Sequence, residues 1–218
     1  MYRHTTLQLL PERALYLPQT QTLLLSDVHL GKAETFQRAG IPIPHQVNQE
    51  TLHRLTQLCA MHPVQQMVIL GDLFHHSWGM VDAVVQAWHQ FLQTTQVSVQ
   101  LIVGNHDRPL IPALQQFTMH CTTAPVQMQD LVLSHEPVAA APRLNICGHV
   151  HPCFRYKSKL DDIRLPCFFY DRAQPQLILP SFGEFTGGYD VPLTAQSSAY
   201  AIAHHTIIAF DGTPTQSR

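Results

Sequence analysis

Five short apolar runs in this sequence each lead into a polar residue that can bind a metal ion. The runs cover residues 22–25, 67–70, 99–103, 131–133 and 144–147. Their length and their lack of polar alternation predict strands that are buried on both faces. Open α/β sheets bind ligands at the carboxyl ends of their strands, so the five runs point to one common site.

The segments between and after these runs define the expected fold. Residues 45–61 and 81–94 carry apolar side chains at near-helical spacing. Alternation of strand and helix in the first half predicts an α/β fold with parallel strands. The second half predicts strands at 154–156, 164–170, 176–179 and 199–210 with little helix between them, hence a second, partly antiparallel sheet. The length of 218 residues suits a single domain spanning 1–218, with 212–218 as a frayed tail.

The polar residues at the ends of the runs form one set of nitrogen and oxygen donors. They are Asp27, His29, Asp72, Asn105, His135, His149 and His151. The Asp27/His29 and His149/His151 pairs are two positions apart, and on extended chain such side chains point the same way. Gly71, Gly104 and Gly148 precede ligands, where a residue without Cβ allows close approach of the backbone.

The donor types also indicate which metals the site prefers. Mixed nitrogen and oxygen ligation without thiolate suits manganese, iron or zinc better than copper(I) or an iron–sulfur cluster. Four histidines disfavour an all-magnesium site, because magnesium prefers oxygen ligands. The five cysteines contain no Cys-x-x-Cys pair, so they predict neither a thiolate zinc site nor a redox motif.

In this order, the motifs resemble those of the calcineurin-like metallophosphoesterase superfamily. The pattern Asp-x-His, Gly-Asp, Gly-Asn-His-Asp, His, Gly-His-x-His is complete here. The resemblance implies an α/β fold built as a four-layer α-β-β-α sandwich, with two divalent metal ions at the carboxyl edge of the sheets. It implies a first metal held by Asp27, His29, Asp72 and His151. It implies a second held by Asp72, Asn105, His135 and His149, with Asp72 bridging the two.

The same resemblance implies the catalytic residues. His106 matches the catalytic histidine of the superfamily, and Asp107 matches the carboxylate that orients it. Two metals can clamp the attacking and leaving oxygens of an in-line displacement, so the expected nucleophile is a hydroxide that bridges them. A protonated His106 can donate to the leaving oxygen, and a nearby Asp107 favours its charged form.

A narrower resemblance lies outside the metal motifs. The segments Gly31-Lys32-Ala33-Glu34-Thr35-Phe36 and Phe185-Thr186-Gly187-Gly188 are similar to those of the ligase-associated DNA damage response endonucleases of the PdeM type. The similarity covers roughly 14–188. It implies a manganese-dependent phosphodiesterase that acts on DNA in bacterial repair, alongside an ATP-dependent DNA ligase, a helicase and a second nuclease.

Substrate contacts are predicted beside the metal motifs. Lys32, Arg38 and Arg108 follow these motifs closely and could hold phosphates that flank the scissile bond, although each could equally be a solvated surface charge. Trp78, in the loop after the second motif, is a candidate for base stacking. Trp88 fits the apolar side of a helix and is predicted to be core.

The charge balance keeps other functions open. Thirteen basic and fifteen acidic residues give a formal net charge of −2, which argues against holding nucleic acid by charge alone. A small-molecule phosphohydrolase acting on a nucleotide or a lipid pyrophosphate is therefore an alternative. A non-catalytic, metal-bound repair scaffold is another, although the His106–Asp107 pair disfavours it.

The sequence also predicts the setting of the protein. No signal-peptide pattern and no apolar run of about 20 residues is present, which predicts a cytoplasmic protein without a membrane segment. Related enzymes often dimerise, so a homodimer is one expected state. Neither the cut position, endo- or exonucleolytic, nor the strandedness of the substrate follows from the sequence.

Overall fold

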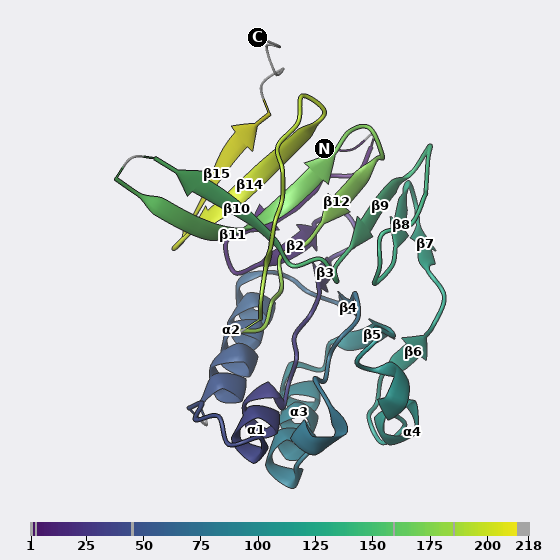
Figure 1. Cartoon of the computed structure of the whole chain (residues 1–218). Helices are drawn as coiled ribbons and strands as arrows, with labels where there is room; N and C mark the ends of the chain where they lie inside the picture. The colour runs from purple at the N-terminus through teal and green to yellow at the C-terminus, as the bar shows by residue number, and fades with distance from the viewer. Residues whose placement is uncertain (1, 3, 45, 159, 185, 213–218) are drawn as a thin grey trace.

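The computed structural model describes residues 2, 4–44, 46–158, 160–184 and 186–212, whose strands form two sheets (Figure 1). The first sheet has the strand order β1-β2-β3-β4-β5-β6. Its strands are β1 (Gln8–Leu10), β2 (Ala14–Leu17), β3 (Thr22–Leu25), β4 (Gln66–Ile69), β5 (Ser98–Ile102) and β6 (His120–Thr122). Strands β3 to β6 are parallel, whereas β1 and β2 add an antiparallel edge.

The second sheet follows the order β13-β10-β11-β12-β9-β8-β7, and β14 and β15 join it through β11. Its strands are β7 (Val126–Met128), β8 (Leu131–Leu133), β9 (Leu144–Cys147), β10 (Pro152–Lys157), β11 (Asp162–Asp171), β12 (Gln176–Ile178), β13 (Tyr189–Asp190), β14 (Ser197–Ala203) and β15 (Thr206–Asp211). Strands β8, β9 and β12 are parallel, and β10, β11, β14 and β15 pair antiparallel. The predicted α/β class with a second, partly antiparallel sheet is confirmed.

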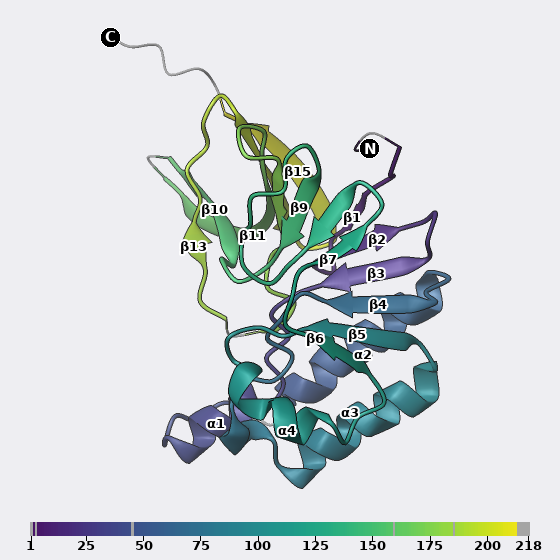
Figure 2. The ribbon, with the colours of Figure 1, turned by 90° about the vertical axis from the view of Figure 1, so that its right-hand side faces the viewer.

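The helices gather beside the first sheet (Figures 1 and 2). They are α1 (Lys32–Arg38), α2 (Val47–Met61), α3 (Asp82–Thr95) and α4 (Ile111–Leu114), with short 3-10 helices at Ser77–Gly79 and Arg108–Leu110. The predicted helices over 45–61 and 81–94 are confirmed as α2 and α3. The sequence does not predict α1, because its seven residues contain too few apolar positions to show a helical period.

The strands of the first sheet are apolar on both faces because each face meets a different core. Along β3, Leu23 and Leu25 pack with helix residues such as Trp88, whereas Leu24 joins a second cluster. That second cluster includes Ile146 of β9, so it fills the space between the two sheets. Alternating side chains of one strand thus enter opposite layers, as the period of a strand requires.

On the outer side of the second sheet no helix is seen in the described part of the chain, because α1 to α4 gather beside the first sheet (Figures 1 and 2). Instead the outward residues of β11 form a smaller apolar cluster with the neighbouring strands. Phe154 of β10 stacks on Phe210 of β15, with ring centroids 4.2 Å apart. This face of the sheet therefore packs largely against its own strands.

One predicted strand is wrong in its extent. Residues 199–210 form not one strand but most of the hairpin β14–β15, in which Ala203 pairs with Thr206. The turn is His204-His205, and His204 has a left-handed backbone with φ of 53°. Hairpin turns of this kind usually carry glycine or asparagine, so two histidines gave no turn signal.

The predicted frayed tail, residues 212–218, lies outside the described residues except for Gly212, and the single domain over 1–218 stays a prediction. Among the residues that are described, no helix combines the length and apolar character needed to cross a bilayer.

Trp88 is the largest fully buried side chain, so its removal tests the core between α3 and the first sheet. We expect Trp88→Ala to lower the free energy of unfolding by about 3–5 kcal/mol, through lost burial and the cavity left behind. Urea denaturation of the variant measures this change. Met61→Ala is the matched control, because Met61 is 60% exposed and should alter stability by less than about 0.5 kcal/mol. Equal effects of the two substitutions would contradict the packing described.

Candidate metal centre

The predicted ligands come together where the two sheets meet. Strands β3, β4 and β5 end at one edge, and β8 and β9 of the second sheet end beside them. The Asp27 amide donates to the carbonyl of Gly71 (3.0 Å), and the His29 amide donates to that of Asp72 (2.9 Å). The His149 amide donates to Asp27 Oδ2 (3.0 Å), which joins the second sheet to the first.

The backbone at these residues is left-handed, which the sequence does not predict. The φ angles are 54° at Asp27, 51° at His29, 56° at Asp72, 67° at His149 and 52° at His151. The expectation that each Asp-x-His or His-x-His pair lies on extended chain is therefore wrong. A left-handed conformation costs about 1–3 kcal/mol at a non-glycine residue and clusters at functional sites. Both members of each pair turn toward the centre through this conformation.

The first group of donors is formed by Asp27, His29 and His151. Their ligand atoms all lie within 4.8 Å of one another. His151 Nε2 lies 3.0 Å from Asp27 Oδ1, and His29 Nε2 lies 3.9 Å from Asp72 Oδ2. Both ring nitrogens of the buried His29 lack a hydrogen-bond partner among the described residues. An imidazole buried in that way suits a metal ligand, because it holds its lone pair free.

The second group is formed by Asn105, His135 and His149. His135 Nε2 lies 2.9 Å from Asn105 Oδ1, and His149 Nδ1 lies 3.1 Å from the same oxygen. His135 Nε2 also lies 3.1 Å from His149 Nδ1. The other nitrogen of His135, Nδ1, lies 2.9 Å from the carbonyl oxygen of Leu70 and donates to it in the matching tautomer. In that tautomer Nε2 and the neighbouring Asn105 Oδ1 both offer lone pairs, which a metal ion could accept.

The Asp72 carboxylate lies between the two groups. Its Oδ1 is 3.7 Å from His135 Nε2, and its Oδ2 is 3.9 Å from His29 Nε2. Each oxygen thus faces a different group. This is the placement expected of a carboxylate that bridges two ions.

Glycines permit this crowding, as the sequence predicts. A Cβ at Gly71 would overlap the His135 ring, and one at Gly104 would overlap the Asp72 carboxylate. A Cβ at Gly148 would meet Asp27 and its neighbour Ser26. The close approach of backbone to ligand is therefore built into these three positions.

The electrostatics of the site are those of a cation-binding centre. Burial raises the pKa of Asp72, and the neighbouring Asp27 and Asp107 carboxylates raise it further against the opposing effect of His135. Burial lowers the pKa of His29 to about 2, so its ring is neutral. Burial would raise the pKa of Asp27, but contact with His151 outweighs it and lowers that pKa overall. A divalent cation would offset the repulsion among these buried carboxylates.

His106 lies beside both groups with its side chain 36% exposed. Its Nε2 lies 4.0 Å from Asp72 Oδ2, and its backbone amide donates to Asp72 Oδ1 (3.0 Å). Its Nδ1 lies 2.8 Å from the carbonyl oxygen of His75 and donates to it in the matching tautomer. That contact leaves Nε2 facing the site, where a substrate can reach it.

Asp107 is arranged differently from the expected orienting carboxylate. Its oxygens accept from the amides of Asp72 (2.7 Å), Phe74 (3.2 Å) and Gly104 (3.1 Å). It is fully buried, and burial raises the pKa of its carboxyl against these hydrogen bonds. Asp107 therefore fixes the two loops that carry Asp72 and His106, and the His75 carbonyl orients the His106 ring.

Comparison with known families gives a match over residues 20–166 to the calcineurin-like phosphoesterases. The chain belongs to this family. The family resemblance drawn from the motifs is thereby confirmed, and the chain is a metal-dependent phosphoesterase. Its candidate ligands fit the divalent metals that the family uses, in donor chemistry and in the unpartnered nitrogens of His29.

Among solved structures, the chain resembles a nuclease. The chain is similar to the Pseudomonas putida nuclease MPE, with a TM-score of 0.82 and 31% identity over 94% of this chain and 96% of that one. A protein of unknown function, AQ665 from Aquifex aeolicus, has a TM-score of 0.42 and 18% identity over 63% of this chain and 81% of its own, too low to support an argument. The search of curated proteins gives no match.

The predicted substrate cations lie in different surroundings. Lys32 is half-buried at the start of α1, where burial lowers the pKa of its ammonium against the pull of Asp27 and Asp72. Arg38 is exposed and lies over the ring of Trp78, 4.7 Å from its centroid. Arg108 is exposed directly after Asp107. Lys32 thus lies close enough to the carboxylates of Asp27 and Asp72 for their charge to act on it.

His75 lies at the centre without being one of the predicted ligands. It follows the Gly-Asp motif, and its ring stacks on that of His106 with centroids 4.9 Å apart. Its ligand nitrogen falls within 4.8 Å of those of His29 and His106. A histidine three positions after Asp72 was the available signal, although it is not one of the predicted ligands.

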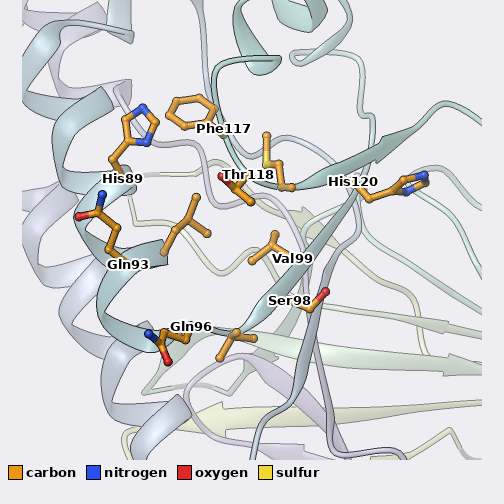
Figure 3. Close-up of a pocket in the computed structure, with 11 residues that line it drawn as sticks. His89, Gln93, Gln96, Ser98, Val99, Phe117, Thr118 and His120 are labelled. Atoms are coloured by element: carbon orange, nitrogen blue, oxygen red, sulfur yellow. The ribbon is translucent and has the colours of Figure 1, made fainter.

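A hollow of about 750 Å³ lies away from the candidate metal centre (Figure 3). It lies between α3 and residues 117–120, and Ser98 and Val99 at the start of β5 line its floor. The metal ligands follow the opposite end of β5. The hollow is therefore not part of the candidate centre.

Asp72→Asn tests the bridging placement. An amide lacks the charge of the carboxylate and offers one oxygen, so we expect loss of metal from both groups together. The measurement is metal content per chain after dialysis against manganese, by plasma mass spectrometry. His89→Ala, a histidine on α3 away from the centre, should keep the wild-type content. Loss of only half of the metal would argue against a shared ligand.

Proposed function

We propose that this protein is a nuclease that hydrolyses phosphodiester bonds of DNA with two divalent ions, manganese foremost, and iron or zinc as alternatives. The observation that carries the proposal is the shared carboxylate of Asp72 between two donor groups. The similarity to a nuclease over 94% of the chain supports it. Family membership alone would also fit a monoesterase.

The proposed ligand groups follow the geometry of the site. Asp27, His29 and His151 would hold one ion and Asn105, His135 and His149 the other, with Asp72 between them. When bound, such a pair of ions lowers the pKa of the attacking water and neutralises charge on the phosphate. The left-handed loops and the glycines hold the side chains in place before substrate arrives.

Protonated His106 is proposed to donate its Nε2 proton to the leaving oxygen, which leaves a neutral ring with Nδ1–H on the His75 carbonyl. The His75 carbonyl fixes Nδ1, and the exposed Nε2 faces the site beside Asp72. Asp107 has a positioning role, because it accepts from the backbone of both adjoining loops. Leaving-oxygen protonation matters for a diester, whose leaving group is a poor alkoxide.

Basic side chains near the centre are proposed to bind the DNA phosphates, because a net charge of −2 for the whole chain gives no general attraction for a polyanion. Lys32, on which the Asp27 and Asp72 charges act, is the proposed contact of the scissile phosphate, and the exposed Arg108 that of a neighbouring one. A cytoplasmic place in a repair set with an ATP-dependent ligase and a helicase is an extension of the same proposal. It rests on the sequence resemblance.

His106→Ala separates chemistry from metal binding. We expect it to keep both ions but to lower kcat by about 10²- to 10⁴-fold, the usual contribution of a general acid. Turnover of a manganese-loaded sample and its metal content are measured together. His89→Ala is again the control and should keep wild-type turnover. An active His106→Ala enzyme would assign the acid to another group.

The substrate class is tested by cleavage of a labelled DNA oligonucleotide beside bis(p-nitrophenyl) phosphate, with manganese and after its removal by EDTA. We expect metal-dependent cleavage of both by the wild type. Cleavage of the small diester alone would leave the metal chemistry standing and favour a nucleotide or lipid pyrophosphate as substrate. Metal binding without turnover of either would favour the scaffold.

A further inference from the structure

An exposed tryptophan stands next to the candidate centre. Trp78 lies in the 3-10 helix Ser77–Gly79, in the loop that follows Asp72, and it is 48% exposed. The other tryptophan of the chain, Trp88, is fully buried in the core. Part of the Trp78 side chain is therefore open to solvent and can contact a ligand.

The loop that carries Trp78 is held firmly against the first motif. The backbones of Gly31 and Gly79 are in such close contact that a Cβ on either residue would overlap the other. The His75 amide donates to the carbonyl of Leu30 (3.0 Å). The Trp78 amide donates to His76 Nδ1 (3.1 Å), and the two rings meet edge to face with centroids 5.0 Å apart. The indole is therefore presented by a fixed loop.

A cation supports the indole from α1. The guanidinium carbon of Arg38 lies 4.7 Å from the centroid of the Trp78 ring, in cation–π geometry. Arg38 is exposed in the last turn of the helix. Trp78 and Arg38 together form what we call the Trp78 platform, an aromatic ring with a positive charge against it.

The Trp78 platform lies a short way from the reacting groups. His75 links the two, since its ring stacks on His106 and its chain neighbour His76 contacts Trp78. Phe36 of α1 also meets the His75 ring, with centroids 5.9 Å apart. The loop that carries Trp78 is thus joined to the His106 ring by direct contacts.

We propose that the Trp78 platform stacks an unpaired nucleobase of the strand that is being cut. This inference rests on the proposed function and names a base-binding residue for it. Every base has a π-face, so stacking on an indole gives affinity without reading sequence. It also explains how a chain with a net charge of −2 can hold a polyanion, because part of the affinity then comes from bases and the rest from local cations.

The first test measures binding apart from cleavage. The manganese-loaded His106→Ala protein, which is expected to bind without cutting, is titrated with an unlabelled single-stranded oligonucleotide while tryptophan fluorescence is recorded. We expect quenching that is lost when Trp78→Phe is added, because Trp88 is buried. Anisotropy with a labelled oligonucleotide should show Trp78→Ala binding about 5- to 100-fold weaker, the range for one stacked base. Tyr156→Ala is the matched control, since Tyr156 is 49% exposed on β10.

The second test compares substrates in the cleavage reaction. Trp78→Ala should raise KM on a normal oligonucleotide far more than it lowers kcat. Its difference from the wild type should disappear on an oligonucleotide that carries abasic residues around the cut. A merely structural role for Trp78 predicts the same loss on both substrates, which overturns the proposal.

The two proposals can fail separately. Trp78-dependent quenching without cleavage of DNA would remove the nuclease function and keep the Trp78 platform. DNA cleavage with unchanged KM in Trp78→Ala and no quenching would remove the platform and keep the nuclease. Absence of both quenching and cleavage would overturn both.

Discussion

The contact between Asp27 and the residues around His149 and His151 is the constraint on which the rest of the site depends. One oxygen of Asp27 accepts from the His149 amide and the other meets His151 Nε2, while Asp27 itself follows β3. A single buried carboxylate thus ties the end of the first sheet to the end of the second. Because the pKa of Asp27 is held low by these contacts, its charge persists inside the protein.

The positions of the remaining donors around that junction are set by backbone hydrogen bonds and by close backbone contacts at glycines. Asp107 accepts from amides on both the Asp72 loop and its own, and each glycine admits one neighbouring ligand. The centre therefore contains left-handed residues and buried like charges, both of which are unfavourable for folding. A bound cation would offset the repulsion between the charges. Locally unfavourable structure of this kind is expected at functional sites, where the geometry serves function at a cost in stability.

The sequence predicts much of this because strands that are buried on both faces leave an unmistakable apolar run. Strand β9, at Leu144–Cys147, agrees residue for residue, and the ligand after each run follows from parallel topology. The local geometry was not predictable, since left-handed Asp27 and His29 look like any residues after a strand. The role of Asp107 depends on amides that are far away in sequence, which no local pattern encodes. The contact of Arg38 with Trp78 was not predictable either, because it joins residues that are far apart in sequence. The helix α1 that carries Arg38 also shows no periodic signal.

The wide separation of the ligands along the chain has a consequence for biosynthesis. His149 donates to a carboxylate 122 positions earlier, and the set closes only with His151. A nascent chain that ends before these residues carries the early donors on the first sheet, with only β7, β8 and β9 of the second sheet synthesised. Metal loading is then a late event that follows synthesis of β9 and the loop after it. The ligand set is therefore complete only in the folded chain, and any metal ion that needs all of these ligands binds after folding.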